Sequence, residues 1–415
     1  MRETSTSTID NALGVLTAQV LEDLGRETGS ARGLPNAAFN SDEFLALEYE
    51  RLFKRSWVFA GRASEVASKG DVKPVEAAGG ALFIVRGSDD EIRVFHNVCP
   101  HRGARLVVDS QQQSSALTCP YHAWSFGLDG KLKGRPHFHG PDRHDRGNDP
   151  GRDEVCLFEV RSHTWYDWVF VNLDGNACSF DEYMAPAVSR FEGFDLSQFR
   201  YSCYDSFEFR CNWKLAAENF SDTYHVFKVH PGLDETYTQI DRSTARPDGV
   251  HMFMLNTLPE PGHLFSPVKV RDLPNLTGIP KERELTQPAA ILFPNIGLVV
   301  SPGSLQFVYF EPVSADRCVM HLWFYFVGEG AEAPEHEQAR QLIVDDFRTI
   351  NIEDEGICRR LQQGRQCDAY DGGRLAPYWD AGTAHYHRQI ADAILGRGAF
   401  AQACPARGSA GAVIN

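Results

Sequence analysis

The sequence lacks the segments by which proteins enter or cross membranes. Its longest apolar stretches, such as the one near Leu322–Val327, are far shorter than the roughly 18 residues that a membrane-spanning helix needs. The N-terminal segment MRETSTSTID has no apolar core of the kind that secretory signals contain. We therefore expect a cytoplasmic protein with no membrane partner.

The sequence also lacks any run of basic residues. It holds 41 Lys and Arg residues against 56 Asp and Glu residues, which gives a formal net charge of −15. This balance argues against binding to nucleic acid or to anionic membranes. An acidic surface suits an electron-donor protein with a basic patch, although most acidic cytosolic proteins share the same balance.

Cysteine is neither abundant nor clustered as in a disulfide framework. Ten cysteines are scattered over 415 residues, and structural disulfides are not expected in the cytosol. A hydrophobic content of 42% with 27 Phe residues supplies a sizeable core, and the length suits two domains. Two of the cysteines, however, have a spacing that is typical of a metal site.

The first half of the chain changes from helical to β-type patterns. Apolar residues at helical spacing predict a helix before residue 40 and a second helix from Ser41. Residues 56–135 consist of short apolar runs separated by Gly, Asp and Asn, which is typical of a small antiparallel β domain. A polar loop at 137–153 is followed by strands that end in WVFVNLDG.

The second half combines strands with long helices. A strand near residue 205 precedes a helix that opens near Asn212, and residues 289–329 contain at least three strands. A long helix at 334–364 and a shorter one at 382–396 follow. The pattern predicts an α+β protein whose second part is an antiparallel sheet packed by helices.

The first metal motif is Cys99-Pro-His101, seventeen intervening residues, and Cys119-Pro-Tyr-His122. Each half offers one thiolate and one imidazole. Two thiolates on one iron and two imidazoles on the other give the Cys₂His₂ ligation of a Rieske [2Fe–2S] cluster. A Cys₂His₂ zinc site is the competing interpretation, but zinc fingers group their two cysteines and their two histidines separately.

These residues resemble the Rieske domain of the ring-hydroxylating oxygenases. Respiratory-type Rieske proteins differ because an extra disulfide ties their two loops together. The corresponding positions here are Ala104 and Tyr121, so that disulfide cannot form. The resemblance therefore favours the low-potential oxygenase type.

The second motif lies in NWKLAAENFSDTYHVFKVHP, which contains Asp222, His225 and His230. It resembles the D-x-x-H-x4-H pattern in which the oxygenase family supplies two histidine ligands to a mononuclear non-haem Fe(II). Two imidazoles and one carboxylate on one face of Fe(II) leave the other face open for O₂ and substrate. On an ideal helix the two histidines lie about 140° apart, so we predict a π-type turn or a break within residues 225–230.

We expect the third ligand to be Asp354. In the helix around 340–362 it lies near the centre of an apolar stripe that also contains Ile343, Phe347, Ile350, Ile357 and Leu361, whereas Glu353 and Glu355 lie at or beyond its margins. A buried carboxylate is costly unless it is paired or bound to metal. The I-E-D context also resembles the segment that carries the family's third ligand. The alternative is a core Asp bonded to a backbone or Arg group.

The resemblance gives Asp222 a different role. In the family this carboxylate lies between a ligand histidine, here His225, and a Rieske histidine, here His122, of a neighbouring subunit. A carboxylate there orients both imidazoles and couples the two centres. The alternative is an ordinary Asp on the helix surface.

Two further groups are open to a simple explanation. His137, His139 and His144 lie in a highly charged loop without a soft ligand, which favours a solvated loop over a metal site. Trp379, His385, Tyr386 and His387 resemble a segment of oxygenases that act on quaternary ammonium compounds, whose cations bind aromatic faces. Packing of the last helix explains the same residues, and we favour it.

The resemblance to a Rieske non-haem iron oxygenase alpha subunit covers most of the chain. It implies an N-terminal helical segment at 1–40, an antiparallel β Rieske domain at 41–172 and a helix-grip (START-like) catalytic domain at 173–415. It also implies a homotrimer that takes NAD(P)H electrons through a flavin and iron–sulfur reductase, with or without a ferredoxin. The expected reaction with O₂ is hydroxylation, dihydroxylation or oxidative demethylation of a small aromatic acid or methylated amine. The alternative is a Rieske electron carrier with no oxygenase chemistry, and the sequence does not reveal the substrate.

Overall fold

The computed structural model describes residues 12–232, 245–258, 270 and 272–400, which form two compact units. The first unit is Phe53–Ala177, and the second combines the residues before Phe53 with those from Cys178 onward. The expected α+β class, with a β-rich Rieske unit and a second unit built on an antiparallel sheet, is confirmed. The domain limits at residues 41 and 172 remain predictions. By its contacts, the helix that begins after Ser41 groups with the second unit and not with the Rieske unit.

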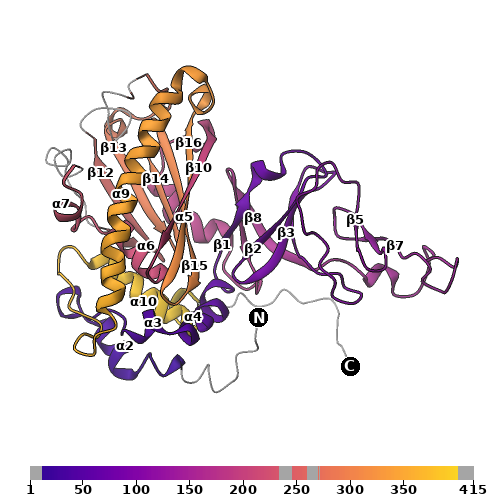
Figure 1. The fold of residues 1–415 in the computed structure, drawn as a ribbon, viewed down its shortest axis with the longest axis horizontal. Helices are drawn as coiled ribbons and strands as arrows, with labels where there is room; N and C mark the ends of the chain where they lie inside the picture. The colour runs from indigo at the N-terminus through magenta and orange to yellow at the C-terminus, as the bar shows by residue number, and fades with distance from the viewer. Residues whose placement is uncertain (1–11, 233–244, 259–269, 271, 401–415) are drawn as a thin grey trace. The chain divides into compact units, whose positions relative to one another are not determined.

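The first unit contains a six-stranded and a three-stranded sheet (Figure 1). The larger sheet has the order β1-β9-β8-β4-β3-β2, and all its pairs are antiparallel. Its strands are β1 (Val58–Arg62), β2 (Val72–Ala77), β3 (Gly80–Arg86), β4 (Ile92–His96), β8 (Glu159–Trp165) and β9 (Trp168–Asn172). The smaller sheet consists of β5 (Leu117–Thr118), β6 (Ser125–Phe126) and β7 (Leu132–Gly134). Short 3₁₀ turns occupy Ala63–Val66 and Arg152–Glu154.

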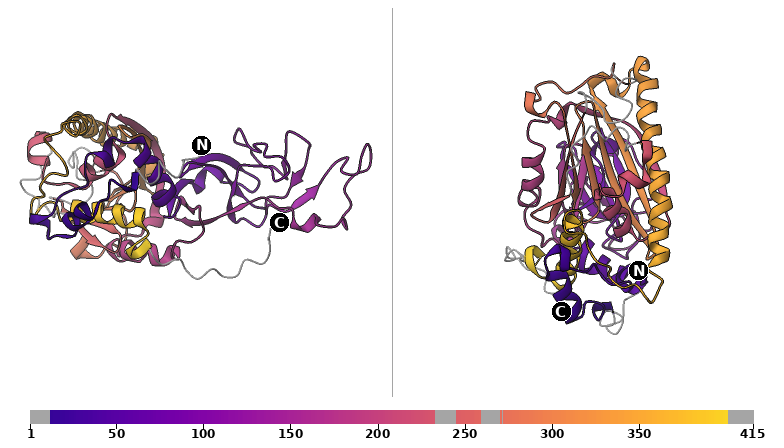
Figure 2. Two further views of the ribbon diagram at one scale, coloured as in Figure 1. Left: turned by 90° about the horizontal axis from the view of Figure 1, so that it is seen from below. Right: turned by 90° about the vertical axis from the view of Figure 1, so that its left-hand side faces the viewer.

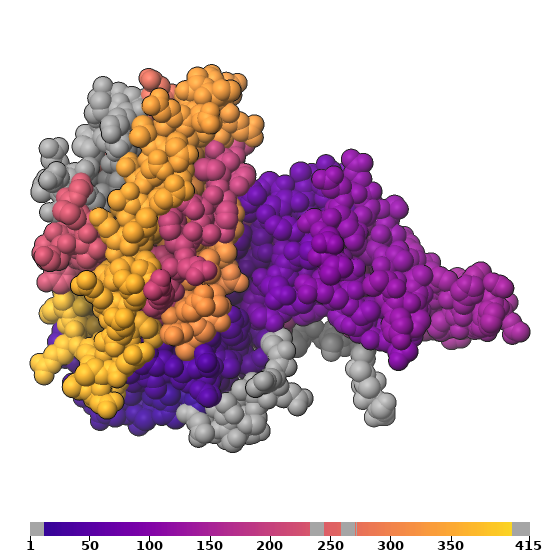
Figure 3. Space-filling model, in the orientation of Figure 1, coloured from indigo at the N-terminus to yellow at the C-terminus, as the bar shows by residue number. Residues whose placement is uncertain are grey.

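The segment that follows β7 projects from the rest of the first unit (Figure 3). This is the polar loop expected at 137–153. Arg135 and Arg152 both bind the carboxylate of Asp145, at 2.8 and 3.0 Å, and the side chain of Asp145 is only 3% exposed. The loop therefore has a buried ion cluster of its own and is not solvated throughout.

The second unit is a seven-stranded antiparallel sheet with helices packed on it. The strand order is β10-β16-β15-β14-β13-β12-β11. The strands are β10 (Phe199–Phe209), β11 (Arg246–Asp248), β12 (His251–Thr257), β13 (Thr286–Leu292), β14 (Ile296–Val300), β15 (Ser304–Ser314) and β16 (Arg317–Val327). The helices are α2 (Ala18–Gly25), α3 (Ala37–Asn40), α4 (Asp42–Glu48), α5 (Phe180–Arg190), α6 (Trp213–Ser221), α7 (Val226–Val229), α9 (Glu337–Gly364) and α10 (Ala381–Leu395), with a π-helical turn at Tyr49–Phe53.

Helices α6 and α9 bring the candidate ligands to the sheet. Helix α6 contacts strands β12 to β16 and also packs on α9. Figure 2 shows the long α9, coloured orange, running beside the strands. Among the described residues, none of the helices is both long enough and apolar enough to traverse a lipid bilayer.

The start of α6 is fixed by the side chain of Asn212. Its carbonyl accepts a hydrogen bond from the Lys214 N–H at 3.1 Å and so caps the helix. Its amide donates to the Ala315 carbonyl at 2.7 Å, and its backbone N–H donates to Gln362 of α9 at 2.8 Å. One residue therefore ties α6 to both α9 and the end of the sheet.

A buried ion pair joins α6 to α4. Lys214 donates to Glu48 at 2.7 Å, and both side chains are fully buried. Trp213 also donates its indole N–H to Glu48, at 2.9 Å. Burial raises the pKa of Glu48 and lowers that of Lys214, so each charge depends on the other for its stability.

Candidate functional site

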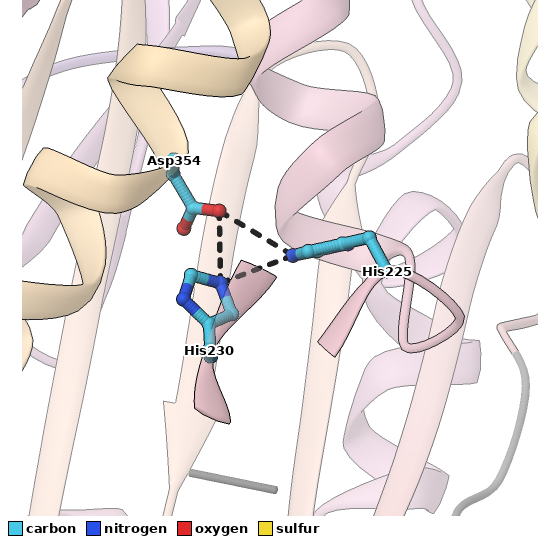
Figure 4. A group of neighbouring side chains, drawn as sticks. All are labelled: His225, His230 and Asp354. Carbon is cyan, nitrogen blue, oxygen red and sulfur yellow. Dashed lines mark hydrogen bonds and ion pairs between the residues drawn. The ribbon is translucent and has the colours of Figure 1, made fainter. Parts of the chain in front are cut away.

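Three side chains from two segments of the second unit converge on one point. Helix α6 ends at Ser221, and the chain then makes the single turn of α7, with His225 before it and His230 after it. Asp354 lies on α9, opposite this turn, and is 8% exposed (Figure 4).

The ligand atoms of these residues form a nearly equilateral triangle. His225 Nε2 lies 3.1 Å from His230 Nε2, and Asp354 Oδ1 lies 3.3 and 3.0 Å from these two nitrogens. Ligands about 2.1 Å from one metal ion and at right angles to one another are about 3 Å apart. The triangle therefore fits three ligands on one face of an octahedral metal ion. Among the described residues, it is the one group of three or more His, Cys, Asp or Glu residues whose ligand atoms all lie within 4.8 Å of one another.

Each histidine turns its second ring nitrogen towards a carboxylate. His225 Nδ1 is 3.1 Å from Asp222 Oδ2, and His230 Nδ1 is 2.7 Å from Glu353 Oε2. An Nδ1–H that donates to a carboxylate leaves the Nε2 lone pair directed at the metal position. Glu353 was not predicted, because its relation to His230 depends on how α7 packs against α9.

The carboxylates also control the charge of the histidines. Burial opposes protonation of His225, but Asp222 and Asp354 outweigh it and raise its pKa to about 9. The pKa of His230 is also raised, since Asp354 and Glu353 outweigh the effect of burial. A metal ion bound here would take the place of these protons, because it needs the neutral imidazoles.

The predicted helix break within residues 225–230 is present, because α7 ends at Val229 and the backbone of His230 is not helical (φ −118°, ψ 72°). The predicted π-type turn is absent there, and a second interruption, which was not predicted, separates the end of α6 at Ser221 from the start of α7 at Val226. The cause of this second interruption is Asp222, whose carboxylate accepts the Tyr224 N–H at 2.7 Å and so competes with helical hydrogen bonding.

The prediction for the long helix is partly corrected. Ile343 is buried, but Leu361 is 45% exposed and does not continue the buried stripe. The partners of Asp354 are the two histidines, not an arginine as in the alternative interpretation.

The two loops of the first metal motif have the same backbone construction. In the first loop, the Cys99 N–H donates to the Ala104 carbonyl at 2.7 Å, and the Gly103 N–H donates back to Cys99 at 3.0 Å. The second loop repeats these bonds. The Cys119 N–H donates to Trp124 at 2.8 Å, and the Ala123 N–H donates to Cys119 at 3.0 Å. Gly103 and Ala123 both have a positive φ, which gives the two loops the same reversal.

The side chains of these loops face one another. The thiols of Cys99 and Cys119 are buried and interact, and burial together with the Cys119 thiol raises the pKa of Cys99. The ring centroids of His101 and His122 are 4.7 Å apart. His122 Nδ1 is buried without a hydrogen-bond partner among the described residues, as expected for a metal-ligating nitrogen. The indole of Trp124 stacks on His101 at 4.3 Å.

The remaining candidate histidines and Tyr386 contact other protein groups. The ring of His144 contacts that of His137, and His139 bonds to Asp149 at 2.8 Å, on the exposed loop. Tyr386 donates to the Pro294 carbonyl and His387 bonds to Glu218, both at fully packed positions, as the packing interpretation predicts.

A cavity of about 130 Å³ opens next to the triangle of ligand atoms, between the sheet and the helices α6 and α9. Its wall is mainly apolar and includes Phe220, Val226, Met254, Ala289, Val299, Val308, Met320, Phe347 and Ile350. The polar part of the lining consists of the amides Asn219, Asn256, Gln287 and Asn351, with Asp222, Thr223 and the three candidate ligands. No Lys or Arg stands among the described residues that line it. Trp379, His385, Tyr386 and His387 do not line it either.

Comparison with protein families assigns both units. The Rieske [2Fe–2S] domain matches residues 56–143, and the ring-hydroxylating alpha subunit catalytic domain matches residues 196–396. The chain belongs to the Rieske oxygenase alpha subunits. The family uses a [2Fe–2S] cluster and a mononuclear iron and receives electrons from a separate reductase. The chain is therefore an oxygenase, and the alternative of an electron carrier without oxygenase chemistry is not supported.

Individual relatives match between about half and most of the length of this Rieske oxygenase. The carnitine monooxygenase oxygenase subunit of Acinetobacter pittii is 27% identical over 361 residues, which is 85% of this chain and 91% of that protein. The glycine betaine monooxygenase oxygenase subunit of Pseudomonas aeruginosa is 28% identical over 54% of this chain and 50% of its own length.

Solved structures share the fold. The quaternary ammonium Rieske monooxygenase CntA matches with a TM-score of 0.73 and 22% identity, over 90% of this chain and 98% of that one. Naphthalene 1,2-dioxygenase from Rhodococcus matches with a TM-score of 0.67 and 19% identity, over 94% of this chain and 98% of that one.

Proposed function

We propose that His225, His230 and Asp354 hold the mononuclear iron, and that Cys99, His101, Cys119 and His122 hold the [2Fe–2S] cluster. The triangle of about 3 Å between two imidazole nitrogens and one carboxylate oxygen carries the first assignment. The buried facing thiols and the unpartnered His122 Nδ1 support the second. Bound at the triangle, iron would supply the activation of O₂.

Asp222 is proposed as the link between the two centres. Its contact with His225 Nδ1 supports one half of this role. The other half is a contact with His122 of a neighbouring copy, so the proposed assembly is a cytoplasmic homotrimer. Electrons would come from NAD(P)H through a flavin and iron–sulfur reductase.

The proposed substrate is a small methylated ammonium compound. Two relatives act, by their names, on carnitine and glycine betaine, which are quaternary ammonium compounds. The cavity supports the same class, because outside the three proposed iron ligands its described lining has one charged residue, the acidic Asp222, and no Lys or Arg that would repel a cation. Its volume of about 130 Å³ suits a small molecule.

The proposed reaction is a monooxygenation next to nitrogen. One oxygen atom of O₂ converts a C–H bond on a carbon attached to nitrogen into C–OH, and the other leaves as water. The reductase supplies the two electrons, and solvent supplies the two protons. The C–N bond to the hydroxylated carbon then breaks, so that the amine leaves with the bonding electrons, a carbonyl forms and the hydroxyl proton passes to solvent. The chain's own residues position the substrate carbon and exclude water from the apolar cavity.

Iron analysis tests the ligand assignment. The wild-type protein should contain about three irons per chain, and His225→Ala should contain about two with the visible absorption of the cluster unchanged. Three irons in both proteins, or loss of cluster absorption in the variant, would contradict the assignment.

Oxygen uptake tests the substrate class. With a surrogate reductase, methylated ammonium compounds should stimulate O₂ consumption and release an aldehyde and an amine. Aromatic acids serve as the comparison panel. If only the aromatic acids stimulate uptake, the proposed substrate class is wrong while the oxygenase assignment stands.

A further inference from the structure

The wall of the cavity includes part of a buried row of hydrogen-bonded polar side chains. The Asn256 amide on β12 donates to the Gln287 carbonyl on β13 at 3.1 Å. Gln287 in turn donates to the Ser301 hydroxyl at 2.8 Å. All three residues are at most 7% exposed, and Asn256 and Gln287 line the cavity.

This row of hydrogen-bonded side chains leaves one acceptor atom, Asn256 Oδ1, without a partner in the part of the protein that the structure describes. The Asn256 Oδ1 atom is buried and has no hydrogen-bond partner among the described residues. A buried carbonyl without a partner is costly, so such an atom in a cavity wall indicates a ligand that supplies the missing donor. The Asn256 amide nitrogen donates one of its two N–H groups to Gln287, so the carbonyl oxygen is the polar atom of this side chain that has no partner at all within the described ranges.

The same wall is poorly suited to a carboxylate. Its described lining has no Lys or Arg, and Asn256 Oδ1 would itself repel an anionic oxygen. Quaternary ammonium compounds with a terminal carboxylate would therefore find no cationic partner for that group among the described lining residues.

We infer that Asn256 is a specificity-determining residue that accepts a hydrogen bond from a neutral donor group, such as a hydroxyl, on the substrate. The inference rests on the proposed function for the ammonium end of the substrate and adds the chemistry of the other end. The preferred substrate class is thus a methylated ammonium compound that carries a hydroxyl or amide N–H, not a carboxylate.

Equilibrium binding to the iron-loaded protein tests this inference with three probes. These are (2-hydroxyethyl)trimethylammonium, n-propyltrimethylammonium, in which a methyl group replaces the hydroxyl, and glycine betaine. Isothermal calorimetry should show that the hydroxyl compound binds about three- to tenfold more tightly than the propyl compound. Glycine betaine should bind most weakly.

Two variants of Asn256 separate specificity from folding. Asn256→Leu should bind the propyl compound at least as well as the hydroxyl compound. Asn256→Asp keeps an acceptor and should retain or strengthen the preference for the hydroxyl. Gln306→Leu is the matched control, since Gln306 is a buried amide on β15 outside the described cavity lining and its loss should leave the preference unchanged.

Equal binding of the hydroxyl and propyl compounds to the wild type would overturn the inference, as would tightest binding of glycine betaine or no binding of any probe. Equal weakening of all probes by Asn256→Leu would also overturn it. If the hydroxyl preference depends on Asn256 but no ammonium compound is oxidised, the proposed reaction fails and the binding role of Asn256 stands.

Discussion

At the scale of single residues, the candidate iron centre depends on carboxylates that do not face the metal position. The carboxylate of Asp222 is hydrogen-bonded to Nδ1 of His225, and that of Glu353 to Nδ1 of His230. They fix the orientation of the rings and raise their affinity for protons and for metal alike.

Glu353→Gln should weaken Fe(II) binding by about 10- to 100-fold, because the His230 ring loses its charged partner. Iron retained after dialysis against increasing chelator concentrations measures the effect. Glu355→Gln is the matched control, since Glu355 lies on the same helix and its recorded ion pair is with Arg210, at 4.0 Å. Equal iron loss in both variants would show that Glu353 has no particular role.

A second residue predicts the response of stability to pH. His251 donates to the Tyr183 carbonyl at 2.7 Å and accepts the Phe293 N–H at 3.0 Å. Burial lowers its pKa from 6.5 to about 4. As the pH falls, His251 takes up a proton at a higher pH in the unfolded state than in the folded state. Its contribution to the free energy of unfolding is therefore fully present above pH 6.5 and is lost as the pH falls towards 4.

The expected loss from His251 is about 3 kcal/mol of unfolding free energy between pH 7 and pH 4. Urea unfolding at a series of pH values measures it, and His251→Asn should show a shallower decline over the same range. Parallel profiles for the two proteins would contradict the assignment.

At the scale of elements, the ion pair between α4 and α6 fixes the helix that leads to the ligands. Lys214→Met should lower the free energy of unfolding by about 3–5 kcal/mol, because Glu48 would keep a buried charge without its partner. The double variant Glu48→Leu/Lys214→Met removes both charges and should recover most of that loss. Chemical denaturation measures both, and a double variant less stable than the single one would show that packing, not charge, dominates.

The candidate site shows which features could be predicted from the sequence and which depend on contacts between elements. Motif spacing singled out His225 and His230, and the apolar stripe of the long helix singled out Asp354; the structure brings the three together. The helix break within residues 225–230 followed from the spacing of the two histidines, but the interruption before α7 was not predicted, because it depends on the Asp222 side chain bonding to the backbone of Tyr224. Glu353 and Asn256 were not identified, because their roles arise from contacts between elements far apart in the chain.

At the scale of the whole molecule, each chain contains one Rieske unit and one catalytic unit. The proposed electron path through Asp222 crosses from one copy to the next. The assembly should therefore have about three times the chain mass of 46.4 kDa, close to 139 kDa by light scattering. A monomer in solution would contradict the proposed path.

Mixed assemblies give a sharper test of the same path. Cys119→Ser removes a proposed cluster ligand, and His225→Ala removes a proposed iron ligand. Each variant alone should be inactive, but co-expressed chains should regain part of the activity, because an intact cluster in one copy faces an intact iron site in another. Mixed assemblies that stay inactive would place the path within one chain.

The repeated construction of the two cysteine loops has a consequence for biogenesis. Each loop is closed by its own main-chain hydrogen bonds, from Cys99 to Ala104 and from Cys119 to Trp124, and none of these bonds involves iron or sulfide. The two cysteine loops can therefore take up their backbone conformation as the chain folds. Insertion of the cluster then becomes a late maturation step, which a scaffold protein could carry out on an already folded precursor.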